Sequence, residues 1–309
     1  VYIFLCIKQN KGLHFILACL ITKESIILGL LMQGKVCVIT GATTGIGKVI
    51  AIALAKHGAY IVSIYRDEEK AKELQEIFKT FQGNIALYKG DLSSLKETRK
   101  ATLQITRDFP QVDLLFNNAG LINKNYEETI DGIETTFQVN HLSSFLLTKI
   151  FLQHTKKNHL CVINTSSHAH KRVQTIDWED IGLKQSYTMW KAYCQSKLFN
   201  ILFTKELARR YPADKLTATC FHPGFVRSNF GANNSPILQK IIMTVLIPFS
   251  VSTQEGARTG IYLALLGKKA KRGEYYFKNK ISRVKTLASD KKAANKLWDI
   301  STKMLKQEA

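Results

Sequence analysis

Tyr193 and Lys197 are the residues of this sequence whose types and spacing point most directly to chemistry. They stand four positions apart in the segment "YCQSK", and this spacing places both side chains on one face of a helix. A lysine ammonium beside a phenol favours the phenolate and lowers the phenol pKa from its usual value of about 10. The pair therefore predicts a tyrosine that can donate and accept a proton near neutral pH.

Two hydroxyl groups, those of Ser166 and Ser167, end the apolar segment "VINTSS" upstream of this pair. Ligands of open α/β sheets bind at the carboxyl ends of the strands, so we predict that Ser167 hydrogen-bonds a substrate carbonyl. A serine hydrolase is disfavoured, because the sequence has no GxSxG nucleophile elbow. His168 and His170 are spaced like two metal ligands but have no third ligand nearby in sequence, so we predict no metal site.

The glycine-rich stretch "ITGATTGIGKVIA" predicts a phosphate-binding turn, and two kinds of turn compete for it. A nucleotide-hydrolysing P-loop needs GxxxxGK followed by Ser or Thr. Ala42 stands at the first of those glycine positions and Val49 at the hydroxyl position. What remains is Gly41, Gly45 and Gly47 between a strand and a helix, where the backbone can approach a pyrophosphate at the helix N-terminus. The loop therefore favours a dinucleotide-binding fold.

The elements that must position these residues alternate along the chain. Five apolar segments read as buried strands, namely "KVCVIT", "AYIVSIY", "NIALYKGD", "VDLLFNNAG" and "HLCVINTSS". Helical periodicity fills the intervals, as in "GKVIAIALAKHG" and in "DEEKAKELQEIFKTF", where Asp67 is the expected N-cap. Such alternation demands parallel pairing through right-handed crossovers. We predict an α/β fold, a single-domain Rossmann-type doubly wound parallel sheet with helices on both faces.

Taken together, these motifs resemble those of the short-chain dehydrogenase/reductase family, and within it the retinol dehydrogenase group. The resemblance covers roughly residues 35 to 305 and rests on "TGATTGIG", "NNAG", "VNHLSSFLLT", "INTSS", "YCQSK" and "HPGFVRS". It implies that residues 34–309 form the short-chain dehydrogenase/reductase domain. The implied activity is hydride transfer between a nicotinamide cofactor and an alcohol or carbonyl.

The resemblance also assigns roles to single positions. The catalytic tetrad maps onto Asn140, Ser167, Tyr193 and Lys197. Tyr193 would act as general acid and base, Lys197 would tune it and bind the nicotinamide ribose, Ser167 would orient the carbonyl, and Asn140 would hold a water linked to Lys197. Besides Tyr193 and Lys197, the implied cofactor-binding residues are Gly41, Thr43, Thr44, Gly45, Ile46, Gly47, Arg66, Asp91, Leu92, Asn117, Ala119, Gly120, Pro223, Gly224, Val226 and Ser228.

The end of the second strand bears on which nicotinamide cofactor is used. An NAD site usually carries a carboxylate there for the ribose hydroxyls, but the sequence has Tyr65 followed by Arg66. A guanidinium can pair with the 2′-phosphate of NADP. Asp67 comes one residue later and is better explained as a helix cap, whereas Asp91 matches the family position near the adenine amino group. We predict NADP(H), with NAD(H) as the alternative.

The expected substrate is a lipophilic small molecule, such as a retinoid, a steroid or a lipid-derived carbonyl. The segment "SPILQKIIMTVLIPFSV" is strongly apolar and occupies the place of the family's mobile flap over the substrate; a helix packed on the core or at an interface is the other interpretation. Polar Asn123 and Lys124 after "NNAG", and Ser143 and Ser144 in "HLSSF", depart from the retinol dehydrogenase pattern and put retinol itself in doubt. The alternative function is a catalytically idle NADP-binding protein that regulates or binds a partner at a membrane.

The net charge and residues 1–33 bear on where in the cell the protein is located. The net charge is +20, and the sequence has no nucleic-acid-binding signature. We predict first a solvated basic surface and second an attraction to a membrane, and we predict no binding of nucleic acid. Residues 1–33 are largely apolar, with Lys23 and Glu24 inside the run, and predict a marginal span or an interfacial anchor. Scattered cysteines fit a cytosol-facing chain, so we expect a cytosol-facing membrane such as the endoplasmic reticulum. The family often dimerises through the helices beside "NNAG" and "YCQSK", which makes a homodimer one expected assembly.

Overall fold

The computed structural model describes residues 31–156, 159–225 and 251–306. One sheet of eight strands runs through this part of the chain in the order β3-β2-β1-β4-β5-β6-β7-β8. Every neighbouring pair is parallel except β7 and β8. The strands are β1 (Val36–Ile39), β2 (Tyr60–Tyr65), β3 (Ile85–Lys89), β4 (Leu114–Asn117), β5 (Leu160–Thr165), β6 (Leu216–Phe221), β7 (Tyr275–Phe277) and β8 (Lys280–Ile281).

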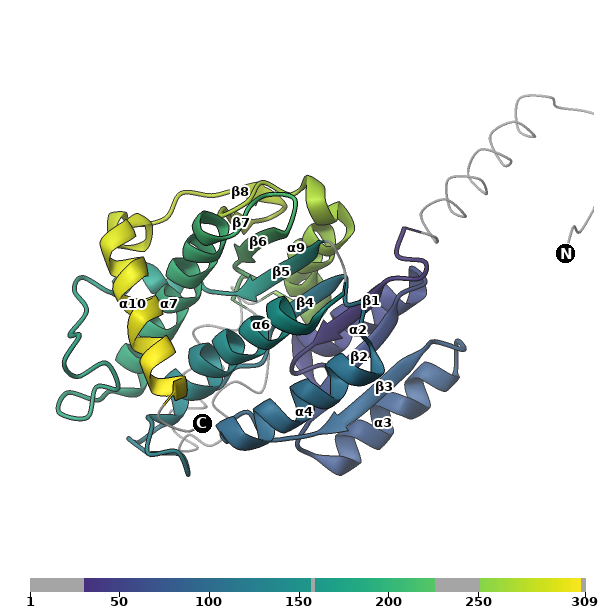
Figure 1. Cartoon of the computed structure of the whole chain (residues 1–309), viewed down its shortest axis with the longest axis horizontal. Coiled ribbons are helices and arrows are strands. Elements are labelled where there is room, and N and C mark those ends of the chain that lie inside the picture. The colour runs from purple at the N-terminus through teal and green to yellow at the C-terminus, as the bar shows by residue number, and fades with distance from the viewer. Residues whose placement is uncertain (1–30, 157–158, 226–250, 307–309) are drawn as a thin grey trace, which may run out of the picture.

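Helices cover both faces of this sheet (Figure 1). The α-helices are α2 (Gly45–Lys56), α3 (Glu68–Lys79), α4 (Leu95–Asp108), α5 (Thr135–Phe137), α6 (Ser143–His154), α7 (Met189–Arg210), α9 (Thr253–Leu266) and α10 (Lys291–Lys306). Shorter turns are the π-helix η1 (Gln138–Leu142) and the 3₁₀ helices η2 (His168–Arg172), η4 (Gly267–Lys269) and η5 (Thr286–Ser289). The predicted Rossmann-type fold is confirmed.

Each face of the sheet has its own apolar core. One cluster joins the sheet to α4, α6, α7 and α10 and includes Phe145, Phe199 and Trp298. The other joins it to α2, α3 and α9 and includes Ile50 and Phe78. The continuous apolar runs of the strands follow from this arrangement, because a parallel sheet is buried on both faces.

Local capping explains where two predicted helices begin. Asp67 accepts a hydrogen bond from the Lys70 backbone N–H at 3.2 Å, so it is the N-cap of α3, as predicted. The helix that carries Tyr193 begins at Met189, because the Thr188 hydroxyl accepts from the Lys191 N–H at 3.1 Å. A turn of helix therefore precedes Tyr193.

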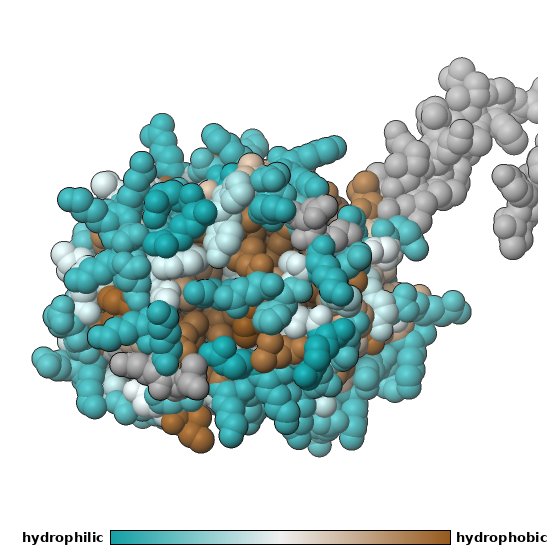
Figure 2. Space-filling model, in the orientation of Figure 1, coloured by the Kyte–Doolittle hydropathy of each residue, from teal (hydrophilic) through white to brown (hydrophobic). Residues whose placement is uncertain are grey.

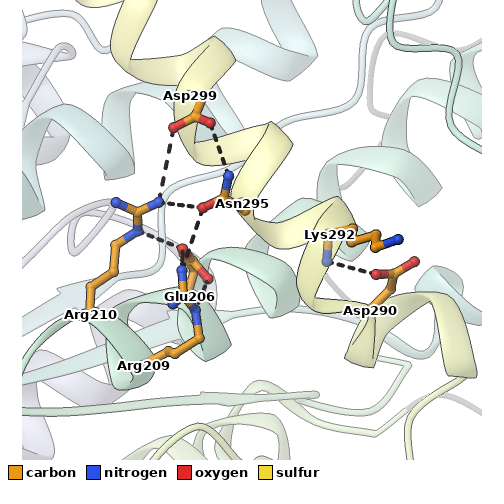
Figure 3. A network of polar contacts seen from close by, with 7 residues as sticks. All are labelled: Glu206, Arg209, Arg210, Asp290, Lys292, Asn295 and Asp299. Carbon is orange, nitrogen blue, oxygen red and sulfur yellow. Dashed lines mark hydrogen bonds and ion pairs between the residues drawn. The ribbon is translucent and has the colours of Figure 1, made fainter.

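Helix α10 packs across α7 and α6. The Trp298 ring lies 4.8 Å from the Phe145 ring and 4.5 Å from the Arg210 guanidinium carbon. Buried Glu206 bonds Arg209 and Arg210, and Arg210 also donates to Asn295 of α10 at 2.8 Å (Figure 3). A second copy that docked on this part of α6 and α7 would have to displace α10.

Hydrophilic side chains predominate on the face seen in Figure 2, in line with the net charge of +20. Within the described ranges no helix combines the length and apolarity that a membrane crossing needs. The predicted anchor, residues 1–33, lies outside the described residues except for its last three positions. The predicted flap segment also falls outside them, apart from its final residue, Val251.

Candidate active site

Tyr193 and Lys197 lie on the buried side of α7, close to the ends of β4 and β5. The Lys197 ammonium is 5.5 Å from the centre of the Tyr193 ring. The Lys197 residue is 3% exposed, and its Nζ donates to the Thr165 carbonyl at 3.4 Å. The spacing of four residues has therefore brought the two side chains together as predicted.

The pKa values differ from the prediction, however. Burial raises the pKa of Tyr193 to about 12, and a hydrogen bond with Ser167 only partly offsets this. Burial also lowers the pKa of Lys197 to about 8. The expected depression of the Tyr193 pKa by the ammonium is wrong for the chain alone, because the loss of hydration raises this pKa by more than the Ser167 hydrogen bond lowers it.

Asn140 meets Lys197 at Gly120. A Cβ atom placed on Gly120 would lie 3.2 Å from Asn140 Oδ1 and 3.3 Å from Lys197 Nζ. The Asn140 amide donates to the Leu121 carbonyl and to Ser196 Oγ, both at 3.0 Å, and its Oδ1 accepts from the Leu121 N–H at 2.8 Å. Glycine at position 120 leaves the room in which these polar groups converge.

Asn140 itself sits in the π-helix η1. Single π-turns are rare and occur frequently at functional sites, because the extra residue changes which side chains point inward. Here the turn directs the fully buried Asn140 to Leu121 and to α7. No sequence pattern marked this turn.

The two serines after β5 have different partners. Ser166 Oγ is buried and donates to the Lys197 carbonyl at 2.7 Å, which ties β5 to α7. Ser167 Oγ accepts from the Ala169 N–H at 3.1 Å and forms the hydrogen bond with Tyr193 that counts in the tyrosine pKa. Ser167 is thus the serine beside the Tyr193 phenol.

The glycine loop is held by the "NNAG" turn. Thr40 Oγ1 accepts from the backbone N–H groups of Asn118 and Ala119, both at 3.0 Å, and Asn118 Nδ2 donates to the Thr40 carbonyl at 3.1 Å. A Cβ atom on Gly47 would lie 2.2 Å from the Gly41 carbonyl oxygen and 2.4 Å from Asn118 Nδ2. Gly47 is therefore required by close packing, which the sequence did not distinguish from direct contact with phosphate.

This loop fits a pyrophosphate. Thr44 is the N-cap of α2 but makes no side-chain cap hydrogen bond, and the first turn has no acidic residue. Gly41 and Gly45 have φ values of +68° and +54°, which favour glycine. Thr43, Gly45 and Ile46 are partly exposed and Thr44 is exposed, so the loop is open to a ligand. Uncapped N–H groups at a helix start attract an anion.

The structure also brings together the two residues predicted for the adenosine end. Arg66 Nη1 lies 3.7 Å from Asp91 Oδ2, with the two side chains 71% and 29% exposed. Asp91 Oδ1 accepts from the Ser93 N–H at 2.9 Å. Leu92 follows, and its carbonyl accepts from Ser143 Oγ at 2.6 Å. Ser143, one of the departures from the retinol dehydrogenase pattern, therefore supports the loop that carries Asp91.

The remaining predicted residues divide by position. Asn117 is buried and donates to Asn164 Oδ1 at 2.8 Å and to Thr148 at 3.2 Å, so it joins β4 to β5 and α6. Pro223 and Gly224 follow β6, and Gly224 has a φ of +92°. Val226 and Ser228 lie outside the described residues.

An aromatic cluster beside Ser167 escaped the sequence analysis. The His168 ring centre lies 4.2 Å from that of His222 and 4.8 Å from that of Phe277. Burial lowers the pKa of His222 to about 3 and that of His170 to about 4, so both rings are neutral at physiological pH. The described residues contain no group of three His, Cys, Asp or Glu side chains that could hold a metal ion.

Comparison with known proteins agrees with this geometry. The family described as short chain dehydrogenase matches residues 35–237. Retinol dehydrogenase 12 of Homo sapiens is 38% identical over 280 residues, which cover 89% of this chain and 87% of that protein. Retinol dehydrogenase 14 of Mus musculus is 36% identical over 290 residues, with the same two coverages.

Solved structures show the same fold. A putative uncharacterized protein from Mycobacterium paratuberculosis is 30% identical and superposes with a TM-score of 0.71, covering 89% of this chain and 94% of its own. A short chain dehydrogenase from Burkholderia cenocepacia, solved in complex with NADP, is 22% identical with a TM-score of 0.64, covering 79% and 96%.

Proposed function

Because the chain belongs to the short-chain dehydrogenase family, we propose that it is an NADP(H)-dependent oxidoreductase that interconverts a lipophilic alcohol and its aldehyde or ketone. The observation that carries this proposal is a chain of contacts from Ser167 to Tyr193 and from Tyr193 to Lys197, which meets Asn140 beside Gly120, next to a glycine loop with an uncapped helix start. Residues suited to proton transfer and a loop suited to a dinucleotide thus lie at one edge of the sheet.

The residues of the chain would divide the work of reduction as follows. Ser167 Oγ and the Tyr193 phenol both hydrogen-bond the substrate carbonyl oxygen. Tyr193 gives its proton to that oxygen as the carbonyl carbon is reduced, and takes a proton back when an alcohol is oxidised. A proton transfer positioned in this way contributes about 10²- to 10⁴-fold. The bound nicotinamide supplies or accepts the hydride.

Lys197 would make Tyr193 a better acid and base once the ammonium is held in place. Within the described residues its Nζ donates only to the Thr165 carbonyl, at a long 3.4 Å, so it has donors to spare for ribose hydroxyls. Asn140 and Gly120 fix the space beside it. A fully charged Lys197 favours the phenolate and so moves the Tyr193 pKa down from about 12.

For the cofactor, we propose NADP(H) over NAD(H). Support comes from Arg66, whose side chain is 71% exposed at the end of β2 and lies 3.7 Å from Asp91. A guanidinium there can pair with a 2′-phosphate. The Burkholderia cenocepacia relative was solved with NADP. Asp67, the nearest carboxylate in sequence, is occupied as the N-cap of α3.

For the substrate, we propose a lipophilic carbonyl or alcohol. The similar proteins named retinol dehydrogenase support this class. The departure at Ser143 does not weigh against a retinoid, because Ser143 bonds the Leu92 carbonyl on the adenosine side. The backbone carbonyl of Asn123 accepts from the Tyr187 hydroxyl at 2.8 Å, and the side-chain Nδ2 donates to Glu127 at 3.0 Å, so Asn123 is held by neighbouring groups of the chain.

The test is consumption of NADPH with retinal, steroid ketones and medium-chain aldehydes, compared between the wild type, Tyr193→Phe and Tyr126→Phe. Tyr126 is a matched control, since its hydroxyl bonds Glu128 at the surface. We expect Tyr193→Phe to bind NADPH normally and to lose at least about 10²-fold in kcat. Equal turnover by Tyr193→Phe would contradict the proposed role. NADPH binding without turnover of any substrate by the wild type would favour the idle NADP-binding protein.

A further inference from the structure

Trp190 is an exposed aromatic residue in contact with the proposed general acid. It belongs to the first turn of α7 and is 47% exposed. Its ring is stacked on the Tyr193 ring, with the centroids 5.7 Å apart and the planes inclined by 30°. Among the exposed large apolar side chains of the described ranges, Trp190 is the one with a ring contact to a residue of the proposed tetrad.

Helix geometry places Trp190 at the outer end of the catalytic row. Positions 190, 193 and 197 are three and four residues apart, so their side chains share one face of α7. Along this row, exposure changes from the half-exposed indole of Trp190 to the 3% exposed Lys197. Tyr193 stands between them, with the ammonium 5.5 Å from its ring centre.

The indole of Trp190 lies beside the group that meets the substrate oxygen in the proposed function. The substrate carbonyl oxygen meets the Tyr193 phenol and Ser167, and Lys197 fills the inner end of the row. The atoms attached to the carbonyl carbon would therefore extend toward the exposed end of the row, where Trp190 stands. About half of the Trp190 residue is covered, and its ring is stacked on Tyr193.

The chemistry of an indole face selects for shape. Flat π-systems stack against it in offset geometry and gain about 0.5–1.5 kcal/mol beyond simple apolar burial. A conjugated carbonyl compound is planar next to its carbonyl carbon, whereas a saturated chain is staggered and presents no flat face. Trp190 would therefore distinguish the two by more than their hydrophobicity.

We infer that Trp190 is a specificity-determining residue, which binds a flat conjugated apolar group next to the carbonyl of the substrate. The inference rests on the proposed function, because it takes Tyr193 as the group that meets the substrate oxygen. It narrows the substrate class from lipophilic carbonyls in general to those with conjugation at the reacting carbon.

The test compares two aldehydes of equal length, (E)-2-nonenal and nonanal, reduced with saturating NADPH. The variants are Trp190→Leu, which keeps an apolar side chain without a flat face, and Trp190→Phe, which keeps a flat face. Ile130→Ala, at a residue 88% exposed, is the control for loss of an exposed apolar side chain. Thermal unfolding of every variant is measured alongside.

We expect Trp190→Leu to lower kcat/KM for the enal by about 3- to 10-fold, mainly through KM, and to change kcat/KM for nonanal by less than about 2-fold. Trp190→Phe should restore most of the preference, and Ile130→Ala should leave it unchanged. A Trp190→Leu variant with the wild-type ratio overturns the inference. Equal losses on both aldehydes with a lower melting temperature also overturn it, since the ring is then a structural cover. Absence of turnover of either aldehyde by the wild type overturns this inference, and absence of turnover of retinal and the steroid ketones as well overturns the proposed function.

Discussion

The catalytic cluster of α7 and the Arg66–Asp91 pair lie at the same edge of the sheet, yet the first is buried and the second is exposed to solvent. Lys197 is 3% exposed and Asn140 is fully buried among hydrogen bonds to Leu121 and Ser196. The Arg66 side chain is 71% exposed, and its contact with Asp91 spans 3.7 Å. One end of the proposed cofactor site is fixed by buried polar groups, and the other presents a solvated charge.

Burial decides what each end can contribute. A buried ammonium interacts strongly with its neighbours, and it lowers the stability of the fold because it has lost its hydration. An exposed ion pair contributes roughly 0–1 kcal/mol and is screened by salt. Chemistry therefore depends on the geometry of α7, whereas the choice between two cofactors that differ by one phosphate can be left to a mobile surface side chain.

The largest effect is expected at the buried end of the site, on substitution of Lys197. In Lys197→Met the side chain keeps its apolar length but loses the ammonium, so Tyr193 is no longer assisted in holding negative charge. We expect kcat to fall by about 10²- to 10⁴-fold, measured as NADPH consumption at saturating cofactor and carbonyl.

The matched control is Lys191→Met. Lys191 stands on the same helix but is exposed, and its Nζ donates to Ser186 at 2.6 Å. Its loss should change kcat by less than about 2-fold, as surface substitutions away from a site usually do little. Similar losses in both variants would show that the ammonium of Lys197 has no special position.

Removal of the Lys197 ammonium should lower activity but raise the free energy of unfolding. Burial lowers the pKa of Lys197 to about 8 in the folded chain, against about 10.4 when unfolded. Between these values the unfolded chain binds a proton that the folded chain has released, so the stability due to this group rises with pH across that window and is constant below it.

Lys197→Met lacks this titration, so its stability should exceed that of the wild type at pH 7. The difference should shrink as the pH is raised from about 8 to 10, by up to roughly 3 kcal/mol. Urea unfolding of both proteins at several pH values measures it. Parallel stability curves from pH 7 to 10 would mean that Lys197 stays charged in the folded state.

The same contrast explains what the sequence could predict. Tyr193, Lys197, Ser167 and Asn140 stand in short motifs whose spacing is fixed by one helix or one strand end, and the structure brings them together. Their surroundings come from distant segments. The rise of the Tyr193 pKa to about 12 depends on burial by several elements at once, which no local spacing reveals.

Contacts between residues far apart in the sequence were not predicted, for the same reason. Asn118 was seen as part of "NNAG", but its bond to the Thr40 carbonyl joins residues 78 positions apart. Ser143 looked like a change near the substrate, and instead it bonds Leu92, 51 positions away. The packing of α10 on α6 and α7, through Trp298 and Phe145, likewise had no signal in sequence.

Arg66 gives the smallest and most selective effect at the exposed end. Arg66→Ala removes the guanidinium that we place against the 2′-phosphate, and the lost charge-assisted hydrogen bonds to a bound phosphate are worth about 1.5 kcal/mol, more than a single exposed ion pair. We expect KM for NADPH to rise about 10-fold while kcat and the KM for NADH stay within about 2-fold. Arg107→Ala, an exposed arginine in the last turn of α4, is the control.

The salt dependence of this effect separates it from damage to the fold. Screening weakens an exposed charge pair, so the advantage of NADPH over NADH in the wild type should shrink as ionic strength rises, and Arg66→Ala should show little further change. An unchanged KM for NADPH in Arg66→Ala would refute the preference for NADP(H). Equal increases in KM for both cofactors would assign Arg66 to the part of the dinucleotide that NADPH and NADH share. The exposed end of the site would then bind the cofactor without selecting between the two, as the buried end does.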